Sequence, residues 1–191
     1  MKIAKIFLIV AMPLVSGAVF AQTPETETQR DVNQQARVEQ GLKSGELNTR
    51  EAAKLEHQES HIDKMQANAL KDGTVSTEEA ARIKQAQDKT SQAIYNQKHD
   101  AQTGNPDSLS SKRMQRDVSR NANQEKRINE GLSSGALTNT EAARLEAGQA
   151  RTDAKEARAG ADGHVGQHEQ DRIQRKENRE SRKIHNEKHD Q

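Results

Sequence analysis

Six of the seven histidines in this sequence form three pairs with a spacing of four residues. The pairs are His57 with His61, His164 with His168, and His185 with His189. On an α-helix this spacing places two imidazoles on one face, one turn apart, a geometry that binds metal ions when other side chains supply the remaining ligands. The six histidines are therefore candidate metal ligands, with zinc, manganese, copper or nickel as candidate ions.

Nearby carboxylates are candidates for the remaining ligands: Glu59, Asp63, Asp100 and Asp190. The alternative interpretation is that the histidines are solvated surface residues. A protonated histidine near a helix C-terminus, as predicted for His99 and His189, is favourable without any metal. Both interpretations remain open from the sequence.

The stretch around Gly73 resembles the second half of an EF-hand calcium loop, with this glycine at the sixth place and Glu79 at the twelfth. The first and third places, which should be acidic, are Asn68 and Leu70. Calcium needs six to eight oxygen ligands, and a leucine side chain offers none. The stretch therefore predicts a turn between helices and argues against tight calcium binding.

Motifs of catalysis are missing from the sequence. It contains no His-Glu-x-x-His, no Gly-x-Ser-x-Gly, no glycine-rich phosphate loop and no cysteine. Acidic residues such as Glu51 and Glu56 lie in repeated capping and ion-pair positions, which predicts that they are solvated. Tyr95 is the only aromatic residue after position 21, so an aromatic-lined substrate pocket is not expected. The sequence predicts a protein that is not an enzyme.

The N-terminus has the pattern of a cleavable secretory signal. Lys2 and Lys5 precede an apolar run at 6–15, and small residues follow up to Ala21. The run is too short for a membrane anchor, so we expect a periplasmic or secreted mature chain without a membrane span. Without the two lysines, 28 basic residues stand against 29 acidic ones. A near-neutral chain with one aromatic residue is not expected to bind nucleic acid.

The chain contains one unit written twice, at a shift of ninety residues. The shift aligns residues 41–42 with 131–132, 51–56 with 141–146, and 98–100 with 188–190. Glycine-containing turns are followed by a capping residue and a glutamate three positions on, as at Asn48 and Glu51, which predicts helix starts. The predicted helices are 26–43, 49–71, 77–99, 113–133, 139–160 and 167–189.

These elements predict an all-α fold of two tandem up-down-up three-helix hairpins. The predicted divisions are a signal peptide at 1–21, a first unit at 22–100, a linker at 101–112 and a second unit at 113–191. Apolar residues at helical intervals give the expected core of the first unit: Val38, Leu42, Leu55, Ile62, Met65, Ile83 and Ile94. Ile62 and Met65 align with Thr152 and Lys155, so the second unit is expected to bury less and to unfold first.

The pattern Gly-x-x-Ser-Gly-x-Leu-Thr-x-x-Glu-Ala at 131–142, its near copy at 41–52, and the Lys-His-Asp endings resemble a group of small secreted proteobacterial helical proteins. The resemblance implies this architecture and export, without implying an activity. The leading hypothesis from the sequence is a divalent-metal buffer or scavenger that uses the histidine pairs. The alternative is a helical interaction module, such as an envelope-stress chaperone, that binds a protein partner through apolar helix stripes.

Overall fold

The computed structural model describes residues 23–189, and within them the chain forms helices and no strands. The helices are α1 (Pro24–Ser44), α2 (Thr49–Ala69), the short 3₁₀ helix η1 (Leu70–Asp72), α3 (Thr77–Lys98), α4 (Leu109–Ser134), α5 (Asn139–Gly160) and α6 (Gln167–Glu187). The predicted signal peptide lies outside the described residues. None of the described helices has the length and apolar character needed to cross a membrane.

The predicted capping boxes form at the helix starts. The backbone N–H of Glu51 donates to the Asn48 side chain at 3.0 Å, and the Glu51 carboxylate accepts from the Asn48 backbone N–H at 2.9 Å. Gly45 ends α1 with a φ of 81°, a left-handed conformation that favours glycine. The sequence placed the start of α4 four residues late, because Ser108 caps this helix within the predicted linker.

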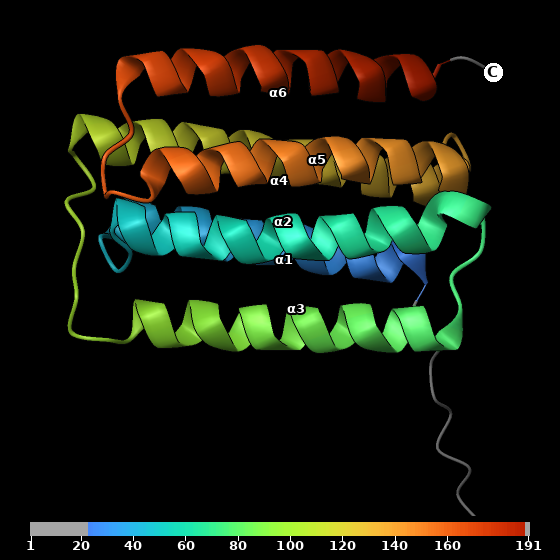
Figure 1. Cartoon of the computed structure of the whole chain (residues 1–191), viewed down its shortest axis with the longest axis horizontal. Coiled ribbons are helices and arrows are strands. Elements are labelled where there is room, and N and C mark those ends of the chain that lie inside the picture. The colour runs from blue at the N-terminus through green and yellow to red at the C-terminus, as the bar shows by residue number, and fades with distance from the viewer. Residues whose placement is uncertain (1–22, 190–191) are drawn as a thin grey trace, which may run out of the picture.

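Four helices form a central bundle, and two helices cover it. Figure 1 shows α1 and α2 stacked on α4 and α5, with α3 on one outer side and α6 on the other. α2 and α5 run antiparallel, since Arg50 at the start of α2 donates to the carbonyl of Asp162 just after α5, at 2.7 Å. In the middle of the pair, the Ser60 hydroxyl donates at 2.7 Å to the carbonyl of Ala150, its equivalent in the repeat.

That contact between equivalent residues locates a pseudo-twofold axis, which relates α1, α2 and α3 to α4, α5 and α6. Small residues also allow α2 and α5 to approach closely where α2 begins and α5 ends. A Cβ on Gly160 would lie 2.8 Å from the Cβ of Ala53 and 3.1 Å from the carbonyl oxygen of Thr49. A larger residue at this position would push the two units apart.

The apolar core extends across both units. Of the predicted core residues, all are buried except Met65, which is half-buried. Val38 and Leu55 of the first unit share a cluster with Met114 and Ile173 of the second. The sequence did not predict this packing between the units, because hydrophobic periodicity shows which face of a helix is buried but not which helix covers it.

We therefore expect the two units to unfold together. The fragments 22–105 and 106–191 each expose the faces that α1 and α2, or α4 and α5, bury in the intact chain. Exposing a large apolar side chain costs about 1.5–3 kcal/mol, so a few of them offset a typical free energy of unfolding. Circular dichroism should show one thermal transition for the intact chain. At low concentration, either fragment should have a melting temperature at least about 10 °C lower. Two separate transitions in the intact chain would contradict this expectation.

Candidate metal centre

The interior of the bundle is acidic. Eleven carboxyl side chains that are at most 2% exposed have a raised pKa. They are Glu27, Asp31, Glu56, Glu59, Asp63, Asp117, Glu125, Glu146, Asp153, Glu156 and Glu177. Lys176 is the one buried cation among the residues that the structure describes, and it pairs with Glu180. Buried charges of one sign are costly unless protons or counter-ions neutralise them.

Three of these side chains form a compact group, which we call the first triad. It consists of Glu56 on α2 with Asp153 and Glu156 on α5, and their ligand oxygens lie within 4.8 Å of one another. Two amides support it. Asn121 on α4 donates to Asp153 at 2.6 Å and to Glu156 at 3.0 Å, and Gln35 on α1 donates to Glu56 at 3.1 Å. All four bundle helices therefore contribute to this site.

A second triad consists of Asp63 on α2, Glu125 on α4 and Glu146 on α5, again with oxygens within 4.8 Å of one another. The ninety-residue shift maps Glu56 onto Glu146 and Asp63 onto Asp153, so the pseudo-twofold axis relates two acids of each triad.

The third acid of each triad comes from a different helix. Glu156 of the first triad corresponds to Gln66, and Glu125 of the second corresponds to Gln35. Because position 66 carries an amide, the second triad lacks a counterpart of Glu156 and takes Glu125 on α4 as its third acid. Because position 35 carries an amide, the first triad lacks a counterpart of Glu125 and takes Glu156 on α5 instead. Each triad therefore holds three carboxylates despite the divergence of the two units.

The two triads meet near the axis, where the carboxyl groups of Asp63 and Asp153 lie close enough to share a proton. Glu59 lies on α2 one turn after Glu56. Neither of its carboxylate oxygens has a hydrogen-bond partner in the described part of the chain. The same holds for one oxygen each of Glu56, Asp63 and Glu125. Buried acceptors without partners are rare in folded proteins, and a bound cation is one physical explanation for them.

Burial raises the pKa of Glu56 from 4.5 to about 8, a shift that the Gln35 hydrogen bond opposes and the charge of Asp117 reinforces. Burial, followed by the charges of neighbouring acids, raises the pKa of Glu59 and Glu156 well above the usual range. The cause is the same throughout: carboxylates without cations lose hydration inside the bundle. Near neutral pH the centre therefore holds either protons or bound cations.

The donor set consists of oxygen alone, which suits hard cations such as Mg²⁺, Ca²⁺ and Mn²⁺. Oxygens bound to one ion at about 2.0–2.6 Å lie at most about 4–5 Å apart, because the largest separation is twice the bond length. In each triad the three ligand oxygens lie within 4.8 Å of one another, which falls within this range. Small rotations of the carboxylates would bring all three onto one ion.

The predicted histidine ligands lie elsewhere, and all six are exposed. The rings of His185 and His189 are 4.3 Å apart, and His189 Nδ1 lies 2.6 Å from the carbonyl oxygen of His185. Glu59 and Asp63 are buried while His57 and His61 are exposed, so these carboxylates do not complete a site with that pair. Within residues 23–189, neither of the two groups of three close ligands contains a histidine.

Sequence reasoning missed the acidic centre and was wrong about Glu51 and Glu56, which are both buried rather than solvated. A signal was present. Acids and amides at 56, 59, 63 and 66 recur at helical spacing, as do those at 146, 149, 153 and 156. A row of polar residues on the inward face of a helix indicates a buried polar network. The sequence alone does not show which polar row faces inward. Comparisons with protein-family models, curated proteins and solved structures find no match to this chain.

Proposed function

We propose that this protein binds divalent cations in the two triads, and that it serves as an exported cation buffer or carrier rather than as an enzyme. The observation that supports this proposal is the pair of buried carboxylate triads at ligand distances, in which several oxygens, among them one each of Glu56, Asp63 and Glu125, have no hydrogen-bond partner within the described residues. A cation satisfies these oxygens and offsets their mutual repulsion. The signal-like N-terminus supports export.

Manganese is the favoured ion. Zinc, copper and nickel prefer nitrogen or sulfur ligands, which the triads lack. Calcium requires six to eight oxygens, whereas each triad offers three carboxylates and nearby amides. Magnesium retains several waters, for which a packed bundle core offers little space. Mn²⁺ accepts carboxylate-rich sites in helix bundles, where facing helices supply the ligands.

Isothermal titration of the chelator-treated chain 22–191 tests the proposal. We expect two Mn²⁺ ions per chain, each with a dissociation constant below about 10 μM, and weaker binding of Mg²⁺ and Ca²⁺. Binding no tighter than about 100 μM for any of these ions would contradict the proposal.

A histidine variant separates the triads from the surface pairs. The double substitution His57→Ala and His61→Ala should leave Mn²⁺ binding unchanged, because these side chains do not reach the triads. Loss of Mn²⁺ binding in that variant would favour the histidine-pair hypothesis. Zn²⁺ binding that depends on these histidines would show a second, superficial class of site without affecting the Mn²⁺ result.

A further inference from the structure

Independently of the proposed cation site, the outer face of α2 carries a groove with a different chemistry. The α2–α3 groove has a volume of about 670 Å³, a size typical of small-molecule sites. Ile62 and Thr90 on its walls are buried, and Met65, Ala86 and Ala93 are half-buried. The groove therefore offers an apolar floor open to solvent.

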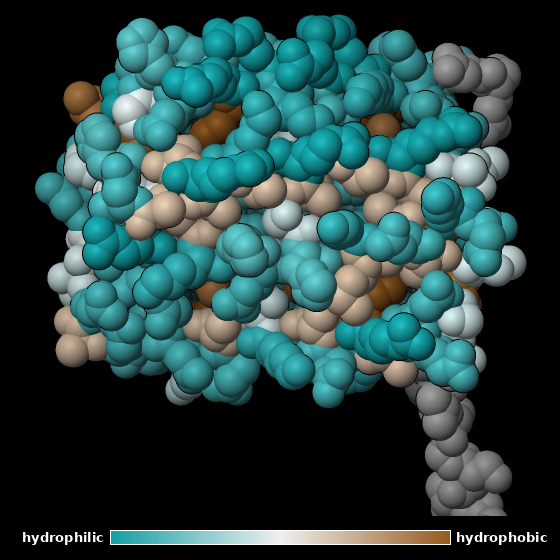
Figure 2. All heavy atoms as spheres, viewed as in Figure 1, coloured by the Kyte–Doolittle hydropathy of each residue, from teal (hydrophilic) through white to brown (hydrophobic). Residues whose placement is uncertain are grey.

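A second groove of about 510 Å³ lies between α2 and α5. His57 and Gln58 line both grooves, so the two meet on α2. Ala53, Ala157 and Ala161 give the second groove its apolar surface. Figure 2 shows such apolar surface as bands that run along the helices between rows of hydrophilic side chains.

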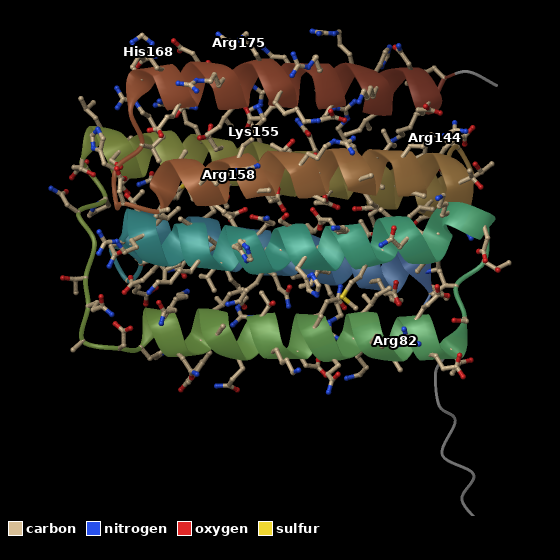
Figure 3. The ribbon with its side chains drawn as sticks, in the orientation of Figure 1. Arg82, Arg144, Lys155, Arg158, His168 and Arg175 are labelled. Carbon is tan, nitrogen blue, oxygen red and sulfur yellow. The ribbon has the colours of Figure 1, made fainter. Side chains whose placement is uncertain are left out.

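Every charged side chain that lines the two grooves is basic. Arg82 and Lys89 line the α2–α3 groove, and Arg50, Lys54 and Arg158 line the other. Figure 3 shows Arg82 on α3 and Arg158 on α5, on either side of α2. No acidic residue lines either groove, although the chain has 29 of them. Many of the acids lie inside the bundle, which leaves this face cationic.

The repeat provides an internal comparison. Ala86 and Ala93 correspond to Lys176 and Lys183 on α6, and Met65 corresponds to Lys155 on α5. Long basic side chains thus stand in the second unit where small or apolar ones leave space in the first. The apolar α2–α3 groove is therefore specific to the first unit.

We propose that the α2–α3 groove binds a single-chain anionic amphiphile, such as a free fatty acid in its monomeric form. The alkyl chain would lie along Ile62, Ala86 and Ala93, and the carboxylate would pair with Arg82 or Lys89. Exposed His57 and His61 border the same groove and can donate hydrogen bonds to the anion. An apolar floor together with a purely basic rim favours this ligand over an uncharged helix, which would leave the cations without partners.

Titration with dodecanoate below its micellar concentration tests this proposal. We expect one bound molecule with a dissociation constant below about 50 μM, and at least about tenfold weaker binding of dodecyltrimethylammonium and dodecyl maltoside, which match the chain length but not the charge. The double substitution Arg82→Gln and Lys89→Gln should weaken dodecanoate binding at least about tenfold. The matched control is Arg172→Gln and Arg179→Gln at the equivalent positions of the second unit, which should have no effect.

A filling variant separates volume from charge. Ala86→Lys with Ala93→Lys introduces the residues that α6 carries at these positions, and circular dichroism of the variant checks that it keeps the helical fold. If the apolar floor matters, this variant loses dodecanoate binding despite its two added positive charges. Stronger binding in this variant, equal binding of the three amphiphiles, or binding only to anionic vesicles would overturn the proposal. Glu56→Gln should leave dodecanoate binding intact, which separates this outcome from any failure of the cation site.

Discussion

In the absence of divalent cations, raising the pH from 5 to 8 should lower the melting temperature of this protein by at least about 10 °C. Glu56 illustrates the cause: its pKa is about 8 in the folded chain and about 4.5 when unfolded. Between these values the folded state holds more protons than the unfolded state, so the free energy of unfolding falls as pH rises. The stabilisation is complete below pH 4.5 and is lost as the pH passes 8. One such group costs about 1.4 kcal/mol per pH unit within this window.

Several other buried carboxyl groups also have a raised pKa, including Asp31 and Asp117, whose pKa rises to about 7. Millimolar Mn²⁺ should restore the stability at pH 8 and have little effect at pH 5, where protons occupy the oxygens. Thermal melts at both pH values, with chelator and with Mn²⁺, measure this difference. Stability that rises with pH in chelator would show that the interior acids are ionised and compensated in some other way.

Removing a single charge from a triad should change stability and cation binding in opposite directions. Glu56→Gln keeps the shape of the side chain but removes an acid that must be protonated or neutralised in the fold. We expect the cation-free variant to be more stable than the natural chain at pH 8, by at least about 1 kcal/mol. Its Mn²⁺ stoichiometry should fall from two ions to one, because the first triad keeps only Asp153 and Glu156.

Two further variants act as controls. Glu146→Gln removes the equivalent acid of the second triad and should leave the first ion bound, while the double variant should bind neither. Glu78→Gln changes an exposed glutamate and should alter neither property. A Glu56→Gln variant that is less stable without cations, and that still binds two ions, would assign Glu56 a purely structural role.

Local features of this fold were predictable from the sequence, and the helices are the clearest example. The capping box of Asn48 and Glu51 and the left-handed Gly45 depend on neighbours within a few residues, so short-range pattern suffices to find them. The predicted start of α4 was less accurate, because its capping residue Ser108 lies in a serine-rich stretch that resembles a linker. The buried status of Ile62 also followed from spacing alone.

The acidic centre was not predictable in the same way. Whether Glu56 faces water depends on α5, which lies ninety residues away along the chain, and hydropathy places an isolated glutamate on the surface. The same limit affects the charge argument. The near-neutral net charge predicted no attraction to anionic partners. Because many acids are buried while the bases are exposed, the protein surface carries an excess of positive charge that the net charge of the sequence does not show.

The axis that passes beside Ser60 and Ala150 has an evolutionary consequence. A twofold axis between equivalent segments is the symmetry of a homodimer, so an ancestral half-length chain would have built this bundle from two identical copies. Fusion of two such copies through residues 99–108 would make that association intramolecular and independent of protein concentration. It would also permit asymmetry. Identical subunits cannot carry glutamine at position 35 and glutamate at its equivalent, whereas the fused chain does, and only after fusion could one half acquire a groove that the other fills.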